Sequence, residues 1–303
     1  MAKKTRNFKI DVFAIISLII IGVYCLSLLA LMGWGVLNSV KSQFDFRNNA
    51  LGFPSAPSAE NAFQAGWHFD NYISAFNVLK VEQNLKIYYL EGLLWNSLVY
   101  AVAMAFTNVA MHLAVAYACA KYTFKLNKIL YTTAVIVMLI PIVGSLPSEL
   151  RVAQLLFGNE NNLLEVCLMK NRYTGVYFLV FYATYKSISW TYAEAAQLDG
   201  AGHFQILVQI MIPLAKNTIM AVFILLFINY WNDYYVPMMF WSQRPTVSYA
   251  LYLAQNSGGL SEFAASVPKQ LAACLIVSLP VLVLFISFRN QIIGNVAMGG
   301  LKG

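Results

Sequence analysis

The chain has 303 residues, of which 59% are hydrophobic and only 11% are charged, with a formal net charge of +7. Soluble domains carry roughly 25% charged residues, so this composition excludes a water-soluble globular protein. The 20 lysines and arginines are scattered rather than gathered in a basic run, which argues against nucleic acid as a partner. The four cysteines form no CxxC pair, so the sequence supports neither a metal site nor a disulfide framework.

Long uncharged segments divide the chain into six predicted membrane spans, because about 20 helical residues cross about 30 Å of hydrocarbon. Four spans are uninterrupted apolar runs, and two are weaker because Lys186 and Asp233 interrupt them. The spans cover residues 12–40, 92–120, 129–148, 173–192, 217–241 and 270–288. Backbone polar groups must be paired inside lipid. We therefore expect an all-α membrane protein with six transmembrane helices and a single domain over residues 1–303.

The distribution of basic residues predicts the orientation of these spans. Lysine and arginine next to a span favour the cytoplasmic side. Six spans place both termini on one side, and the loops on that side are the richer in lysine and arginine. The sequence thus predicts cytoplasmic termini, with residues 289–303 as a cytoplasmic tail.

The predicted membrane interior holds few ionisable groups. An ion-coupled carrier generally places carboxylates or histidines in mid-span, to bind the driving ion. His112 is the one titratable residue well inside a strong span, and we expect it to bond to a neighbouring carbonyl rather than relay protons. Asp233 and Glu149 fall near span ends, where capping or snorkelling accounts for them. The three histidines stand in separate segments, so no catalytic cluster of a membrane enzyme forms locally.

The most informative segment is the predicted cytoplasmic loop 190–216, WTYAEAAQLDGAGHFQILVQIMIPLAK. Residues 192–198 favour a short helix, which the Asp-Gly-x-Gly sequence at 199–202 ends, because glycine adopts left-handed conformations. A second helix is expected from His203, and Pro213 marks its junction with the next span. Its apolar residues recur at helical spacing and predict one continuous stripe. The stripe consists of Phe204, Leu207, Val208 and Met211.

The pattern EAAxxDGA, followed by an apolar stretch and IPL, resembles the cytoplasmic EAA loop of binding-protein-dependent ABC importer permeases. In that family the loop forms a coupling helix that docks into a groove on the ATPase subunit. An amphipathic helix resting on the bilayer is the alternative, but such helices are rich in basic residues and this segment has none between Lys186 and Lys216. The docking residues that the resemblance implies are Glu194, Ala195, Ala196, Asp199, Gly200, Phe204, Leu207 and Pro213.

Further segments are similar to the carbohydrate branch of this family, specifically to its MalG-type subunits. They are FDNYISAF at 69–76, the Asn-Ser pair at 96–97, the YAxAKxxF pattern at 117–124 and FxxxWNDxxxP at 227–237. The glycine-rich tail resembles the end that reaches the ATPase interface in such subunits, which implicates Gly299, Gly300 and Lys302. Ser189 and Asn217 stand where the family usually has proline, which leaves the ends of the loop helices open.

Amides, carboxylates and aromatic rings in the fifth predicted span suit a sugar pathway, because sugars pair hydroxyls with polar groups and CH surfaces with rings. Asn229 and Asn232, three residues apart on one helix face, are the better lining candidates. Tyr230 and Asp233 complete the candidate set. Aromatic residues also gather at membrane interfaces as anchors, and this account of them is equally good.

The resemblance implies a permease subunit of an ATP-driven importer for a sugar or oligosaccharide, in the plasma (inner) membrane of a prokaryote. Its expected partners are a homologous permease subunit forming a heterodimer, two ATPase subunits and an external solute-binding protein, with membrane lipid around the spans. ATP and magnesium belong to the ATPase, so we expect no cofactor on this chain and no enzymatic activity. The alternatives are an ABC permease for another solute such as a polyamine and, from a different class, an ion-coupled secondary carrier.

Overall fold

The computed structural model describes residues 12–56, 65–140, 144–158, 162–256 and 265–299, the last ten without their side chains. The chain divides into two compact units, which are described separately. The first comprises residues 1–78 and 257–276, and the second comprises residues 79–256 and 277–303. The expectation of a single domain stays a prediction.

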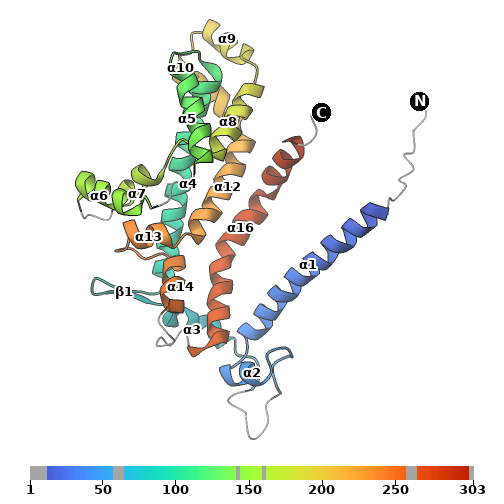
Figure 1. Ribbon diagram of the computed structural model, residues 1–303. Coiled ribbons are helices and arrows are strands. Elements are labelled where there is room, and N and C mark those ends of the chain that lie inside the picture. Colours follow the sequence, from blue (N-terminus) through green and yellow to red (C-terminus); the bar gives the residue numbers. More distant parts are fainter. Residues whose placement is uncertain (1–11, 57–64, 141–143, 159–161, 257–264, 300–303) are drawn as a thin grey trace. The chain divides into compact units, whose positions relative to one another are not determined.

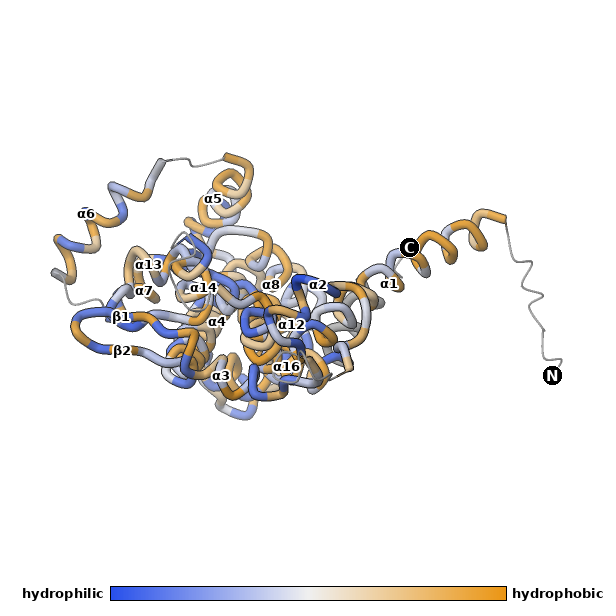
Figure 2. Tube along the Cα trace, turned by 90° about the horizontal axis from the view of Figure 1, so that it is seen from below, coloured by the Kyte–Doolittle hydropathy of each residue, from blue (hydrophilic) through white to orange (hydrophobic). Residues whose placement is uncertain are grey.

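The first unit contains α1 (Val12–Ser39), α2 (Gln43–Asn48), α3 (Asp70–Val78) and the beginning of α16 (Val267–Gly299). Figure 2 shows α1 as an almost continuously hydrophobic helix. None of the residues in its most apolar stretch is buried within the protein. A helix that is apolar all round yet exposed within its own chain suits a lipid environment.

A buried lysine stabilises the segment that follows α1. The ammonium of Lys41, which has no exposed surface, donates hydrogen bonds to the carbonyls of Asn49 at 2.5 Å and Gly52 at 2.6 Å. Asp45 lies near this cation, and its carboxylate accepts from the Ser55 hydroxyl at 2.5 Å. Burial lowers the pKa of Lys41, and the charge of Asp45 opposes that shift. Lys41 therefore supplies hydrogen-bond donors to backbone carbonyls that lie in a loop without regular structure and would otherwise need water.

The second unit is built around α4 (Leu90–Lys121), which packs along α8 (Val176–Ser187) and α12 (Lys216–Asn232), as Figure 1 shows. Several buried residues of α4 are small, and Ala101, Ala105 and Ala116 are fully buried. Small side chains at such positions let helix backbones approach closely inside a membrane. The remaining helices of this unit outside the 190–216 loop are α5 (Asn127–Leu139), α6 (Leu146–Phe157), α7 (Leu163–Lys170), α13 (Tyr235–Phe240) and α14 (Val247–Asn256), with the rest of α16.

A short hairpin is the first departure from an all-α fold. Strands β1 (Val81–Gln83) and β2 (Lys86–Tyr88) pair antiparallel. Asn84 and Leu85 connect them with φ angles of 50° and 63°. Two consecutive residues with positive φ form the turn that matches the twist of a two-residue hairpin. The all-α expectation missed these strands because each has only three residues.

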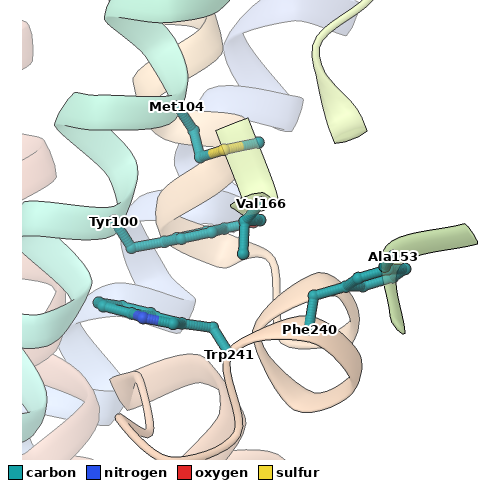
Figure 3. Close-up of a cluster of buried hydrophobic side chains, with 6 residues drawn as sticks. All are labelled: Tyr100, Met104, Ala153, Val166, Phe240 and Trp241. Atoms are coloured by element: carbon teal, nitrogen blue, oxygen red, sulfur yellow. The ribbon is translucent and has the colours of Figure 1, made fainter. Parts of the chain in front are cut away.

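A buried apolar cluster joins the outer helices of the second unit to α4 (Figure 3). The Tyr100 ring stacks against Trp241, with centroids 5.9 Å apart, and the Lys170 ammonium lies 4.1 Å from the centre of the Phe240 ring. The first contact holds the end of α13 against α4, and the second joins α7 to α13. The cluster consists of Tyr100, Met104, Ala153, Val166, Phe240 and Trp241.

Three helices of the described residues are long and apolar enough to cross a membrane: Val12–Ser39, Leu90–Lys121 and Val267–Arg289. They coincide with the predicted spans 12–40, 92–120 and 270–288. A fourth results if the bent pair His203–Leu214 and Lys216–Asn232, with an angle of 77°, counts as one span. The chain is thus a mostly helical membrane protein, and the count of six spans stays a prediction.

The other predicted spans extend beyond the helices that the structure contains. α5 ends at Leu139 rather than 148, because Pro141 disfavours helical geometry at Ile140, which is extended. α8 covers only residues 176–187 of the span expected at 173–192. α12 ends at Asn232 rather than at residue 241, because the next residue, Asp233, has an extended backbone conformation. α5 and α8, with 13 and 12 residues, are shorter than the length needed to cross a bilayer in straight α-helical form.

Candidate functional site

The loop predicted at 190–216 forms a helix–turn–helix at one end of the α4, α8 and α12 group (Figure 1). It contains α9 (Thr191–Leu198), α10 (His203–Ile206), the π-helical turn η1 (Leu207–Met211) and α11 (Ile212–Leu214). The predicted helix at 192–198 and the predicted start at His203 are confirmed.

The turn after α9 has the hydrogen bonds of a Schellman motif. The Gly200 N–H donates to the Gln197 carbonyl at 3.0 Å, and the Ala201 N–H donates to the Ala196 carbonyl at 2.9 Å. Gly200 has a φ of +83°, which a side chain with a Cβ rarely adopts. Nothing lies within 4 Å of where a Cβ would be, so the backbone conformation, rather than space, requires glycine here.

The residues singled out for docking share an exposed surface of this loop. Glu194 and Ala195 are exposed on α9 and Ala196 is half-buried, whereas Ala193 is fully buried and faces the protein. Two large apolar side chains flank the turn in the open, because Leu198 is 90% exposed and Phe204 78% exposed. Asp199 and Gly200, between them, are also exposed. The surface thus combines small, acidic and apolar groups with no basic residue.

The expected apolar stripe on the second helix is wrong in its register. Met211 is buried, but Phe204 and Val208 are exposed and Leu207 is only half-buried. The π-helical turn takes one residue more than an α-helical turn, so residues five apart come to share a face. Ile206 and Met211 therefore form the buried side. A stripe counted at 3.6 residues per turn puts Phe204 on the same face as Met211, whereas in the structure Phe204 is exposed and Met211 is buried.

Pro213 lies, as expected, where this helix meets the next one. It stands in α11, its side chain is exposed, and the chain bends by 77° between residues 203–214 and 216–232. Proline has no N–H to donate and suits the first turn of a new helical segment. The loop is therefore directed away from the axis of α12.

The end of α4 holds the loop on both sides of α9. The Lys121 ammonium donates to the Ile188 carbonyl and lies 5.9 Å from the centre of the Trp190 ring. The Tyr122 hydroxyl is 3.0 Å from His203 Nδ1, and its ring packs edge-on against Trp190 with centroids 5.7 Å apart. Sequence reasoning missed these contacts, because nothing in the spacing of Tyr122 and His203 pairs residues 81 positions apart.

The candidate pathway residues on α12 separate into two pairs. Asn229 and Asn232 are exposed, on the same side as the exposed Leu225. Tyr230 and Asp233 instead bond to α4: the Asn108 amide donates to the Tyr230 hydroxyl at 3.0 Å, and the Tyr100 hydroxyl donates to Asp233 at 2.9 Å. Of these four residues, only the two asparagines are exposed, although the Asn229 side chain hydrogen-bonds to Tyr177 and the Asn232 amide donates to the Ile228 carbonyl at 2.9 Å.

Buried amides join α4, α12 and the segment before α8. Besides Tyr230, the Asn108 amide donates to Asn171 Oδ1 at 3.1 Å, and the Asn171 amide donates to the Thr107 hydroxyl. His112 Nδ1 lies 2.9 Å from the Asn108 carbonyl, the neighbouring-carbonyl bond expected of a histidine at a helix interface. Asn108 and Asn171 were missed, because a lone asparagine in an apolar segment gives no sign of its partner.

Glu149 is engaged by cations, in place of the capping or snorkelling expected for it. Its carboxylate accepts from Lys170, from Arg172 at 2.9 Å and from the Ser145 hydroxyl at 2.8 Å. The hydrogen bond from Lys170, ahead of the charges of the two cations, holds the pKa of Glu149 below its ordinary value of 4.5. Within the described ranges, no group of three or more His, Cys, Asp and Glu could hold a metal ion.

The described residues include only the first of the three tail residues that the family resemblance implicates. Gly299 is the last residue of α16, and Gly300 and Lys302 lie outside the described residues. Their role at an ATPase interface stays a prediction.

Apolar helices of spanning length, with an exposed helix–turn–helix at one end, define a helical membrane protein. Residues 110–292 match the family described as binding-protein-dependent transport system inner membrane component. This match covers more than half of the chain, so the chain belongs to that family, whose members are multi-pass transport permeases of the inner membrane rather than enzymes.

Curated relatives have several different solutes in their names. The chain is 31% identical over 151 residues to the sn-glycerol-3-phosphate transport system permease protein UgpE of Brucella abortus, covering 50% of this chain and 52% of that protein. It thus spans about half the length of this relative. It is 24% identical to the diacetylchitobiose uptake system permease protein NgcG of Streptomyces coelicolor, over 96% of this chain and 89% of that protein. It is 26% identical to the arabinooligosaccharides transport system permease protein AraQ of Bacillus subtilis, over 78% and 79% of the two chains.

A solved structure has the same fold. It is the crystal structure of a bacterial ABC transporter involved in the import of the acidic polysaccharide alginate. One chain of it matches with a TM-score of 0.68 and 19% identity, over 95% of this chain and 99% of that chain.

Proposed function

We propose that the chain is a transmembrane permease subunit of an ATP-driven ABC importer for a sugar or oligosaccharide. Its partners are a homologous permease subunit, two ATPase subunits with their ATP and magnesium, and an external solute-binding protein. Six spans place both termini in the cytoplasm, and the loop 190–216 docks on the ATPase. The family of the chain supports this function, and so do NgcG and AraQ, whose names refer to oligosaccharides.

The exposed surface of α9 carries the proposal. A helix that leaves Leu198 and the neighbouring Phe204 in solvent has apolar area to bury against a partner. Glu194 adds an acid on the same exposed helix, able to form a charge-assisted bond with a cation of the partner. Losing such a bond at a docking surface costs about 1–3 kcal/mol, enough to loosen a complex.

Cross-linking tests the docking directly. A cysteine in place of Leu198, in a chain without its own four cysteines, should form a disulfide with a cysteine scanned through the groove of the ATPase subunit. A cysteine in place of Lys128, exposed at the start of α5, is the matched control and should remain unlinked. Equal cross-linking at both positions, or none at Leu198, would contradict the docking assignment.

Energy coupling separates this function from an ion-coupled carrier. We expect uptake into proteoliposomes to require ATP, the ATPase subunits, the partner permease and the binding protein. Glu194→Lys should impair uptake strongly, whereas His112→Ala should act through packing alone, because His112 bonds to a carbonyl of its own helix. Uptake by this chain alone, driven by an imposed ion gradient and lost in His112→Ala, would overturn the proposal.

The exposed face of α12 favours a neutral polyhydroxyl solute over an anion such as glycerol phosphate. Asn229 and Asn232 offer amide donors and acceptors, and no lysine or arginine follows Lys216 within this helix. An anion crossing a low-dielectric span needs a paired cation, whereas hydroxyls need hydrogen-bonding groups. Asn232→Ala should raise the solute concentration for half-maximal uptake without changing the stability of the complex, because its amide donates only to the Ile228 carbonyl of its own helix. Unchanged uptake would show that Asn232 does not line the pathway.

The glycine-rich tail is the second proposed contact with the ATPase. Deleting residues 294–303 should leave membrane insertion intact and lower uptake, since these residues follow the predicted last span. Unchanged uptake and ATP hydrolysis in the truncated complex would show that the tail is a frayed end.

A further inference from the structure

We propose that Lys121 and Tyr122, the last residue of α4 and the one after it, are positioning residues that make the docking loop and α4 move as one body. This inference rests on the proposed docking of α9 and goes beyond it, because it assigns the connection through which docking acts on the membrane helices. Lys121 bonds to Ile188, which precedes α9, and Tyr122 bonds to His203, which follows α9. The end of α4 therefore holds the loop on both sides of α9.

The first attachment fixes the start of α9. The Lys121 ammonium bonds to the Ile188 carbonyl and lies over the Trp190 ring at 5.9 Å. The Trp190 carbonyl in turn accepts from the N–H groups of Ala193 at 2.8 Å and Glu194 at 3.1 Å. The first turn of α9, and with it the exposed acid, is therefore located by the end of α4.

The second attachment fixes the helix that follows the turn. The Tyr122 hydroxyl bonds to His203 Nδ1 at 3.0 Å and to the Tyr117 hydroxyl at 3.2 Å, so one phenol joins α4 to the first residue of α10. Its ring also meets the rings of Trp190 and His203 edge-on, at 5.7 Å and 5.4 Å. A planar ring held from three sides restricts rotation as well as separation.

Tyr122 is itself held rigidly. Its N–H donates to the Ala118 carbonyl at 3.1 Å, which continues the helical bonding of α4 by one residue. Its carbonyl accepts from the Asn127 side chain at 2.8 Å, and the same amide donates to the Cys119 carbonyl at 3.0 Å. A load on His203 therefore passes into the backbone of α4 and the start of α5, rather than into a flexible loop.

The opposite end of α4 is attached in a similar way to the first residue of α14 and to the segment before it. The Asn96 amide donates to the Pro245 carbonyl at 3.1 Å, and the Ser97 hydroxyl accepts from the Val247 N–H at 2.8 Å. These two residues and Lys121 belong to one continuous helix of 32 residues, about 48 Å long. A displacement of the docked loop would therefore reach α14 through a single rigid element.

The test measures coupling rather than assembly. Tyr122→Phe keeps the ring contacts and loses the bonds to His203 and Tyr117, and Lys121→Met keeps the aliphatic stem and loses the bond to Ile188. In the complete reconstituted transporter, we expect each variant to lower the number of solute molecules imported per ATP hydrolysed by about two- to tenfold, the range for the one hydrogen bond to the loop that each variant loses. Tyr131→Phe and Lys125→Met are the matched controls, on α5 and in the loop before it, and should leave this ratio unchanged.

A second readout removes ambiguity about folding and docking. A spin label at the exposed Gln197 should become more mobile in Tyr122→Phe than in the unsubstituted chain, while the Leu198 disulfide to the ATPase still forms. A disulfide absent from the unsubstituted complex contradicts the docking itself. A disulfide present in both, with label mobility and coupling ratio unchanged in both variants, overturns the role of Lys121 and Tyr122.

Discussion

The Tyr100 hydroxyl donates a 2.9 Å hydrogen bond to the Asp233 carboxylate, which joins the middle of α4 to the first residue after α12. The other carboxylate oxygen accepts from the N–H groups of Tyr235 at 2.9 Å and Val236 at 3.2 Å, and so starts α13. An acid that the sequence offers as a pathway group is thus engaged on both oxygens by its own protein. Its position explains why the fifth predicted span breaks here.

Asp233→Ala should therefore destabilise the protein rather than alter its solute preference. The change removes the acceptor of the hydroxyl of the fully buried Tyr100 and the acceptor of the first N–H groups of α13. We expect a cost of about 1–3 kcal/mol. The unfolding midpoint of the purified complex in detergent measures this loss. Asn232→Ala is the control, since that side chain is exposed and donates only to the Ile228 carbonyl of its own helix, at 2.9 Å. Unchanged stability with lost uptake in Asp233→Ala would return Asp233 to the pathway.

Gly200→Val should leave the chain inserted in the membrane but uncouple it. A β-branched residue at a φ of +83° costs about 1–2 kcal/mol, and relaxing it would open the turn that places Phe204 beside α9. Gly200→Asn should retain most activity, because asparagine tolerates this conformation. Gly202→Ala, at an ordinary φ of −75°, is the matched control. Uptake in Gly200→Val equal to that of Gly202→Ala would show that the turn is dispensable.

The stability of the second unit should fall in acid through Glu149. Its folded pKa lies below its ordinary value of 4.5, so its contribution is complete above about pH 4.5 and is lost as the pH falls through the folded pKa. The unfolding midpoint of Glu149→Gln should therefore be lower near neutral pH, by the equivalent of about 1 kcal/mol, and approach that of the unsubstituted chain in acid. Glu91→Gln, at an exposed acid in the first turn of α4, should lack this pH dependence. Parallel acid profiles for all three proteins would contradict the assignment.

Lys41→Met should lower the stability of the first unit. Methionine fills similar volume but leaves the carbonyls of Asn49 and Gly52 without the buried donor, at a cost of about 1–3 kcal/mol. Because these carbonyls lie in the segment after α2, protease cleavage between residues 49 and 56 is a sensitive measurement. Lys80→Met, at an exposed lysine, should remain as resistant as the unsubstituted chain. Equal resistance of both variants would mean that water replaces the ammonium.

The sequence predicts best what depends on composition and local conformation. Uncharged length locates α1, α4 and the apolar part of α16, because lipid solvation acts on each residue independently. The turn after α9 can likewise be predicted from the sequence, since the positive φ of Gly200 is a local backbone conformation that favours glycine. The predicted spans 129–148 and 173–192 extend beyond α5 and α8, because a sum of hydropathy does not show where a helix ends.

What the sequence does not reveal depends on partners far along the chain. The sequence around Asp233 would be the same whether its carboxylate bound a solute or bonded to Tyr100. Only the packing of α13 on α4 shows that it bonds to Tyr100. The bond between Tyr122 and His203 is of the same kind. The apolar stripe failed for a third reason, a π-helical turn whose extra residue leaves no mark in the residue types.

The π-helical turn at Leu207–Met211 accommodates one extra residue without turning the segment before it. Removing one residue, such as the exposed Gln209, would leave Ile206 and Met211 four residues apart, and a regular α-helix places such residues on the same face. Phe204 and the whole of α9 would then keep their side of the bundle. A loss of one residue inside this turn is therefore absorbed locally, whereas the same loss in a regular α-helical stretch would rotate the exposed side chains beyond it by about 100° around the helix axis.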